Sequence, residues 1–168
     1  MKRFFILMSF ALFLSQAAFA QSEPKFIRDA AILNEDGTLS MIASEAASYH
    51  ATGTVVAEGE SAKVRIGRAD KIRIVVKVKS TEESPMDVVK AFKMKVGKNG
   101  KRTAGLGAYG IKSKALVPFE YDTYGDHCFV LTFTALEPGE YGFWYAPDIM
   151  DYQLGDHQMT FFGIDNIE

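Results

Sequence analysis

Three histidines and a single cysteine are the side chains of this 168-residue chain best suited to bind zinc or to form a thiol nucleophile with its base: His50, His127, His157 and Cys128. None of the histidines stands at a spacing typical of zinc ligands. His127 and Cys128 are neighbours, and adjacent strand residues point to opposite faces, so they are poorly placed to act as base and nucleophile. We therefore expect no metal site, and we expect Cys128 to be a buried small residue or a half-exposed, unreactive thiol.

Acidic and aromatic residues offer a second kind of chemistry. Glu120, Asp122 and Asp126 could serve a glycosidase, in which two carboxylates roughly 5 to 10 Å apart share the work. Trp144 and Tyr152 could stack flat rings on the apolar faces of sugars. The alternative hypothesis is therefore an extracytoplasmic carbohydrate-active enzyme with Trp144 as a platform and Asp122 or Asp126 as acids. Because any acidic segment contains such pairs, we favour a solvated loop for them.

The glycine-rich stretch Gly105-Leu-Gly-Ala-Tyr-Gly110 matches the glycine pattern of a dinucleotide-binding loop. That chemistry also requires a following helix, whose N-terminus meets the pyrophosphate, and an acidic residue about 20 positions later. Strand-like residues follow here instead of a helix. We interpret the glycines as a loop and predict no cofactor.

Basic side chains gather on the polar faces of two predicted strands. They are Lys71, Arg73, Lys77 and Lys79 on the first strand and Lys93 and Lys95 on the second. Together the two faces could form one positive surface for a polyanion such as an acidic glycan or lipopolysaccharide. We favour the other interpretation, in which cross-strand salt bridges absorb much of the charge. Nucleic acid is not an expected partner for an exported protein.

The charges are segregated along the chain. Residues 21–62 hold two basic and seven acidic side chains, residues 63–114 hold fifteen basic and four acidic ones, and residues 115–168 hold ten acidic ones and no lysine or arginine. Such blocks could pair within one molecule or between molecules, so head-to-tail self-association is a hypothesis. The oligomeric state itself is not predicted.

The elements that would position these residues are strands. Apolar and charged residues alternate from Lys71 onward, with Val75 as the exception, which is the two-residue period of a half-buried strand. We expect strands over 71–79, 92–96, 115–121, 129–133, 141–145 and 159–164, a weaker strand over 39–50, and turns at 34–37 and 99–100. About eight strands without a convincing helix predict an all-β, antiparallel sandwich.

One short motif makes the fold prediction more specific. Leu136, Pro138, Gly139 and Tyr141 form the pattern Leu-x-Pro-Gly-x-Tyr, which resembles the tyrosine corner of immunoglobulin-like and fibronectin-like sandwiches. The resemblance implies a Greek-key sandwich in which Pro-Gly carries the chain from one sheet to the other and the tyrosine hydroxyl bonds to the backbone upstream. The Cys-Trp-Cys core of antibody domains is absent, which excludes a strict antibody-type domain.

Three further short sequence segments resemble segments of a group of uncharacterised exported proteins from Bacteroides-type bacteria. They are Gly59-Glu-Ser-Ala-Lys-Val-Arg65, Pro138-Gly-Glu-Tyr141 and Phe162-Gly-Ile-Asp165. The group has no known activity, so the resemblance bears on fold and compartment only.

The first twenty residues have the features of a secretory signal. A basic start at Lys2-Arg3 precedes an apolar stretch over 4–14, and Ala18-Phe-Ala20 has the small residues of a cleavage site. We expect cleavage after Ala20 and one β-sandwich domain over 21–168, periplasmic or secreted and not integral to a membrane. The leading hypothesis is a non-enzymatic binding or structural module of the bacterial envelope that recognises a protein or an anionic glycan.

Overall fold

The computed structural model describes residues 22–105, 114–145 and 155–166. Those residues form twelve strands and one short helix, which confirms the predicted all-β class but exceeds the expected number of strands. In chain order the elements are β1 (Ala30–Leu33), β2 (Leu39–Ile42), β3 (Ser44–His50), β4 (Thr54–Glu58), β5 (Arg65–Ile66), β6 (Lys71–Lys77), α1 (Pro85–Val88), β7 (Val89–Val96), β8 (Lys101–Gly105), β9 (Glu120–Tyr124), β10 (Cys128–Thr134), β11 (Gly139–Tyr145) and β12 (Gly155–Ile164).

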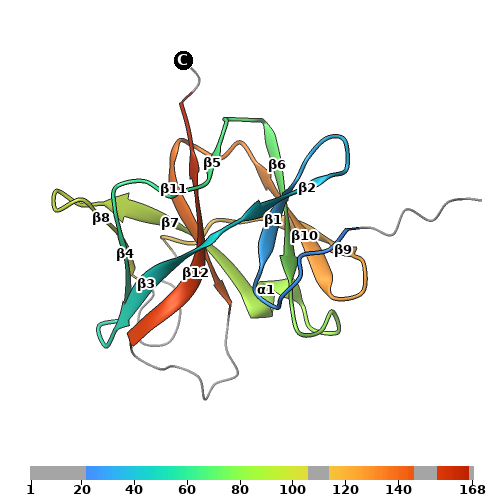
Figure 1. Cartoon of the computed structure of the whole chain (residues 1–168), viewed down its shortest axis with the longest axis horizontal. Coiled ribbons are helices and arrows are strands. Elements are labelled where there is room, and N and C mark those ends of the chain that lie inside the picture. The colour runs from blue at the N-terminus through green and yellow to red at the C-terminus, as the bar shows by residue number, and fades with distance from the viewer. Residues whose placement is uncertain (1–21, 106–113, 146–154, 167–168) are drawn as a thin grey trace, which may run out of the picture.

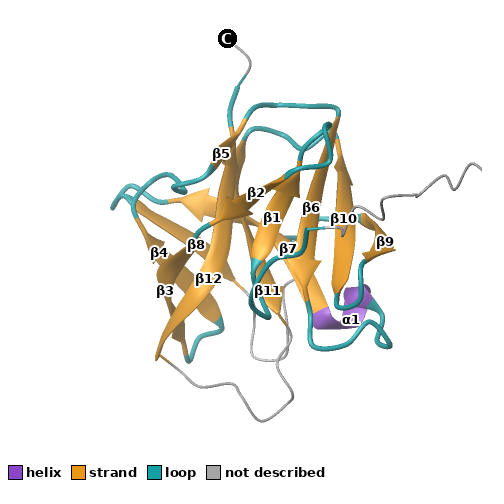
Figure 2. Ribbon diagram, turned by 45° about the vertical axis from the view of Figure 1, so that its right-hand side comes forward, coloured by secondary structure: helices purple, strands orange, loops and turns teal. Residues whose placement is uncertain are grey.

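The strands form two sheets that pack face to face. The first is five-stranded, in the order β2-β1-β6-β10-β9. The second runs β11-β7-β8-β4-β3-β12-β5, and an additional β11–β12 pairing closes six of its strands into a barrel. The pairings are antiparallel except for the parallel contact between β5 and β12. Figures 1 and 2 show the barrel beside the open five-stranded sheet.

Most of the local predictions are confirmed. Gly37 and Gly100 take positive φ angles of 82° and 71° in the two predicted turns, which join β1 to β2 and β7 to β8. The ambiguous residues 39–50 are extended, in β2 and β3. The strand expected over 115–121 begins only at Glu120, after Pro118, which cannot donate to a ladder. Residues 106–113, which include most of the glycine-rich loop, lie outside the described residues.

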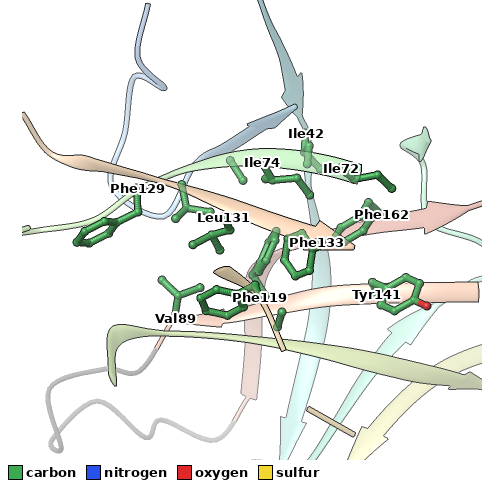
Figure 3. Close-up of a cluster of buried hydrophobic side chains, with 14 of the residues drawn as sticks. Ile42, Ile72, Ile74, Val89, Phe119, Phe129, Leu131, Phe133, Tyr141 and Phe162 are labelled. Carbon is green, nitrogen blue, oxygen red and sulfur yellow. The ribbon is translucent and has the colours of Figure 1, made fainter. Parts of the chain in front are cut away.

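A large hydrophobic core fills the space between the two sheets. Phe133 lies near its centre, and its ring centroid is 5.8 Å from that of Phe119, 6.1 Å from that of Phe143 and 6.5 Å from that of Phe162. The same core contains Tyr141 and residues of β6 and β10, as Figure 3 shows. These residues come from the inner face of the five-stranded sheet and the facing wall of the barrel, so this core holds the two layers together.

A second core fills the barrel itself. It contains Phe92 and Phe161, both with no exposed surface, together with Ala47, Ala57 and Ala104. The alanines leave room for the two rings inside a narrow six-stranded barrel. Strands β7, β11 and β12 therefore contribute side chains to both cores; in β7, for example, Ala91 belongs to the first core and Phe92 to the second.

Candidate functional site

The basic strands do not form one positive face. Strand β6, which carries Lys71, Arg73 and Lys77, belongs to the five-stranded sheet, whereas β7, which carries Lys93 and Lys95, belongs to the barrel. Alternation within each strand was visible in the sequence, but the sheet to which each strand belongs was not. The continuous basic surface considered above is therefore corrected to two separate groups.

Ion pairs within the molecule join the basic segment of the chain to its two acidic segments. The pairs are Arg65–Glu140, Arg65–Asp165, Lys77–Glu23, Lys93–Glu137, Lys101–Glu58 and Arg102–Glu45. Each joins the basic middle of the chain to one of its acidic flanks. Two of the six basic residues of the predicted surface, Lys77 and Lys93, take part in these pairs, and the other pairs are made by Arg65, Lys101 and Arg102. The pairs give the charge blocks a role in folding.

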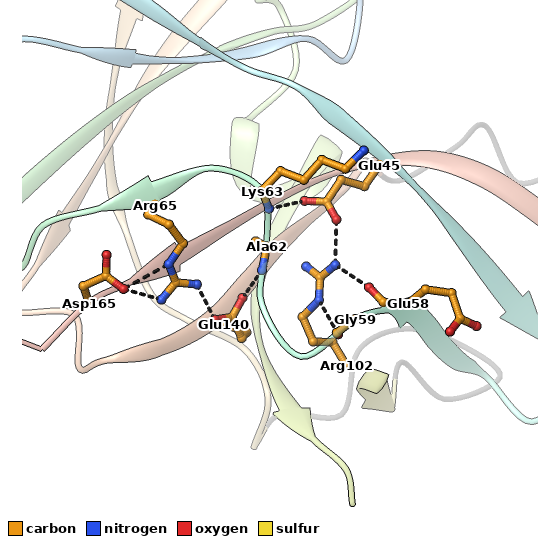
Figure 4. Close-up of polar contacts among 9 residues, drawn as sticks. All are labelled: Glu45, Glu58, Gly59, Ala62, Lys63, Arg65, Arg102, Glu140 and Asp165. Atoms are coloured by element: carbon orange, nitrogen blue, oxygen red, sulfur yellow. Dashed lines mark hydrogen bonds and ion pairs between the residues drawn. The ribbon is translucent and has the colours of Figure 1, made fainter. Parts of the chain in front are cut away.

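The most buried of these charges lie at one end of the barrel, as Figure 4 shows. The Arg102 side chain has no exposed surface, and its Nη2 donates to Glu45 Oε2 at 2.6 Å and to the Glu58 carbonyl at 3.0 Å. Glu45 also accepts the backbone N–H of Lys63 at 2.8 Å. Arg102 Nη1 is buried without a hydrogen-bond partner among the described residues, but the two charges are paired, and we assign this cluster to the stability of the barrel.

A second carboxylate extends this cluster to the end of the chain. Glu140, which is 5% exposed, accepts the backbone N–H of Ala62 at 2.7 Å and pairs with Arg65, which also pairs with Asp165. A Cβ on Gly163 would lie 1.6 Å from Arg65 Nη1, so a larger residue there would displace the guanidinium from this position. The segments 59–65, 138–141 and 162–165 therefore meet in one place. Sequence reasoning missed Glu45, Arg102 and Glu140, because a buried charge has no signature of its own.

A pocket of about 340 Å³ opens where two neighbouring strands part. The ladder between β11 and β12 runs from Gly139–Ile164 to Phe143–Thr160, and no further pair follows among the described residues. We call this pocket the split pocket; it is lined by Ile27, Arg28, Asp29, Ser44, Phe143, Trp144, Tyr145, His157, Gln158, Met159 and Thr160. Its walls are thus the separated ends of the two strands, with residues 27–29 beside them.

Two hydroxyl groups in the wall of the split pocket are fully buried. Tyr145 Oη and Thr160 Oγ1 interact with each other, but neither makes a geometrically complete hydrogen bond with any described residue. Burial raises the pKa of the Tyr145 hydroxyl well above its ordinary value, and the nearby Thr160 hydroxyl opposes that rise. Buried polar groups are nearly always paired, so two hydroxyls in one wall that have only each other require an explanation.

The predicted aromatic residue Trp144 lies in this pocket. Its ring packs against that of Tyr49, with the centroids 5.2 Å apart, on the opposite face of β11 from the buried Tyr141 and Phe143, as expected. Tyr152 lies outside the described residues. The predicted acids are elsewhere: Asp122 lies on β9, the edge strand of the other sheet, and neither it nor Asp126 lines the split pocket.

A second, larger pocket adjoins the first. It has a volume of about 690 Å³ and shares Ile27, Arg28 and Tyr145 with the split pocket. We call it the lateral pocket; its other lining residues are Lys77, Val78, Lys79, Ser80, Glu82, Glu83 and Val88. The structure thus brings three of the predicted binding residues, Lys77, Lys79 and Trp144, to two adjoining pockets, and Lys71, Arg73, Lys93 and Lys95 line neither.

The residue between the pockets has an unusual backbone. Arg28 takes a φ angle of 74°, which is rare for a residue other than glycine. Its N–H donates to the Lys77 carbonyl at 2.8 Å, and the Lys77 N–H donates to the Asp29 carbonyl at 3.0 Å, so β6 holds the turn in place. Strained backbone of this kind persists where the surrounding structure requires it and is enriched at binding sites.

The chain matches no protein-family model, no curated protein and no solved structure. The pockets are therefore interpreted from their own geometry. None of the helical segments in the described part of the chain has the length and hydropathy of a membrane span.

The remaining reactive residue types are dispersed. His50 ends β3, His127 lies in the turn before β10, and His157 lies on β12. Within the described ranges no group of three or more histidine, cysteine or acidic side chains is arranged to hold a metal ion. Cys128 has no exposed surface, as the first of the two expectations for it stated, and burial raises the pKa of its thiol to about 12. A thiol with this pKa is almost entirely protonated at neutral pH and is a poor nucleophile.

Proposed function

We propose that this chain is an exported, non-enzymatic binding module of the bacterial envelope, and that it holds a sugar unit of a glycan in the split pocket. Export rests on the features of residues 1–20. The observation that carries the binding site is the split pocket, whose wall holds Trp144 and two buried hydroxyls, Tyr145 and Thr160, that make no geometrically complete hydrogen bond among the described residues. A buried hydroxyl without a full hydrogen bond costs about 1–3 kcal/mol of stability, and these two oxygens, which have no exposed surface, meet a polar ligand through a small movement of the pocket wall.

The composition of the pocket favours a sugar over the other ligands considered. An aromatic ring from Trp144 can cover the apolar face of a sugar while hydroxyls bond to its edge. Arg28 and Asp29 carry opposite charges, so the pocket has no surplus of cations for an anionic group. An extended peptide is less suited, because β11 continues for only two residues beyond Phe143 and a paired strand needs more.

The same lining argues for binding rather than catalysis. A glycosidase generally needs two carboxyl groups across the scissile bond, and Asp29 is the one carboxylate among the described lining residues. Asp122 and Asp126, the acids of the alternative hypothesis, do not lie beside Trp144 in this pocket. A single carboxylate together with these two hydroxyls suits recognition of a neutral, polar ligand.

We also propose that the frame of this module is an immunoglobulin-like Greek-key sandwich. The order β1-β6-β10-β9 corresponds to the A-B-E-D sheet of such domains, and β8-β7-β11-β12 corresponds to C′-C-F-G. The corner between β10 and β11 supports this assignment, because Tyr141 Oη donates to the Glu137 carbonyl at 2.6 Å, four residues upstream. Strands β3 and β4, inserted between β1 and β6, then close the second sheet into a barrel.

Removing either of the two hydroxyls should increase stability and weaken glycan binding. We expect Thr160→Val and Tyr145→Phe each to raise the free energy of unfolding by about 1 kcal/mol, because each deletes a buried hydroxyl that makes no geometrically complete hydrogen bond. We expect the same variants to weaken glycan binding. Chemical denaturation measures the first effect, and a glycan array followed by calorimetry with the best sugar measures the second.

Thr132→Val and Tyr121→Phe are matched controls, because both residues lie on the five-stranded sheet outside the split pocket. We expect each control to change stability by less than about 0.5 kcal/mol and to leave binding unchanged. A loss of stability in Thr160→Val would mean that its hydroxyl is part of the folded framework. An array on which the purified protein retains no glycan would overturn the proposed function.

A further inference from the structure

We propose that the ligand of this site is a sugar bearing a short peptide with both carboxylate and ammonium groups, with the sugar in the split pocket and the peptide in the lateral pocket. The proposal rests on the function proposed above and extends it to the neighbouring pocket. In this proposal the lateral pocket binds the peptide. A plain sugar would occupy the split pocket alone and would leave the lateral pocket empty.

The two pockets are placed to receive one molecule. They share three lining residues, Ile27, Arg28 and Tyr145, so a ligand that fills the first has the second directly beside it. Their volumes, about 340 and 690 Å³, each fall within the range of ligand pockets. The split pocket suits a single sugar ring, and the lateral pocket beside it is about twice as large. We therefore expect the group attached to the sugar to be larger than the sugar ring.

The lateral pocket differs from the split pocket in its charges. Arg28, Lys77 and Lys79 supply three positive groups, and Glu82 and Glu83 supply two negative ones. Lys77 also pairs with Glu23, at 3.2 Å, outside this lining. A pocket wall with both positive and negative side chains is complementary to a ligand that carries both positive and negative groups. Each charged group of the ligand can then lie beside a side chain of opposite charge.

The apolar part of the same wall suits a peptide. Ile27, Val78 and Val88 line the pocket beside these charges, and Val78 is buried. Short alkyl side chains of a peptide can cover these residues while its charged groups meet the lysines and glutamates. A plain acidic glycan fits less well, since Glu82 and Glu83 would repel it. A free peptide in the lateral pocket would leave the split pocket empty.

Three probes test the proposal by isothermal titration calorimetry. They are the disaccharide N-acetylglucosaminyl-N-acetylmuramic acid, the same disaccharide bearing its tetrapeptide of alanine, glutamate, diaminopimelate and alanine, and the free tetrapeptide. We expect the peptide-bearing disaccharide to bind at least about tenfold more tightly than either part, because two linked groups engage adjoining sites together.

Variants of the lateral pocket identify which part of the ligand lies there. We expect Lys79→Gln and Glu83→Gln each to weaken binding of the peptide-bearing probe severalfold and to leave binding of the plain disaccharide unchanged. Both residues are exposed, so the folded structure should be retained. Lys95→Gln is the matched control, because Lys95 is an exposed lysine that lines neither pocket. It should change neither affinity.

The outcomes separate this proposal from the one on which it rests. Equal affinity for the plain and the peptide-bearing disaccharide would overturn the assignment of the lateral pocket, while the sugar site would stand. Affinity of the free tetrapeptide equal to that of the whole probe would also overturn it. Binding of other glycans without any of the three probes would refute the ligand class alone. Failure to bind any saccharide would refute both proposals.

Discussion

Replacing Arg102 with methionine is expected to lower the free energy of unfolding by about 3–5 kcal/mol, because it leaves the buried carboxylate of Glu45 without its counter-charge. Arg102 has no exposed surface, and the Glu45 side chain is 7% exposed, so water cannot replace the lost partner. The arginine also donates to the carbonyls of Glu58 and Gly59, which the variant leaves without these donors. Urea denaturation monitored by the fluorescence of the single tryptophan, Trp144, measures the change.

Lys101→Met is the matched control for this prediction. Lys101 pairs with Glu58 at 2.6 Å, but the two side chains are 39% and 75% exposed, so the loss should be at most about 1 kcal/mol. Adding Glu45→Gln to Arg102→Met should recover part of the lost stability, because the amide oxygen can still accept from Lys63 and no charge remains buried. Equal effects of Arg102→Met and Lys101→Met would contradict the buried position of Arg102 inside a closed barrel.

Replacing Gly142 with alanine is expected to lower the free energy of unfolding by about 1–3 kcal/mol through overpacking of the barrel. A Cβ at this position would lie 2.7 Å from Phe161 Cδ1 and 2.8 Å from Phe92 Cζ. Neither ring has exposed surface, so neither can move aside without displacing a strand. Thermal and urea unfolding of the variant measure the effect.

Two further variants check that the effect arises from the rings. Gly67→Ala should be close to neutral, because nothing lies within 4 Å of a Cβ there. Adding Phe161→Leu to Gly142→Ala should make the alanine less harmful than it is in the native barrel, since the smaller side chain leaves space. If Gly142→Ala were neutral by itself, the rings of Phe92 and Phe161 could not pack against β11 as described.

Part of the candidate site was predictable from the sequence, and part was not. Trp144 was identified because it lies on the opposite face of its strand from Tyr141 and Phe143, which belong to the core. Lys77 and Lys79 were identified because they are charged residues in a strand and just after it. Tyr145 and Thr160 look like ordinary core residues in the sequence. Their hydroxyls matter because β11 and β12 part beyond Phe143 and Thr160, and the point where a ladder ends depends on the neighbours of both strands.

The sequence by itself determined the all-β class, the two glycine turns and the corner at Tyr141, because strand period, turn chemistry and the tyrosine motif depend on neighbours along the chain. Only the tertiary structure decided that residues 44–58 close the second sheet into a barrel, and that β6 and β7 belong to different sheets. Pairing partners far apart in the chain are selected by packing of whole faces, and no local pattern specifies them. The same reason applies to Glu45, Arg102 and Glu140, whose burial depends on strands more than forty residues apart.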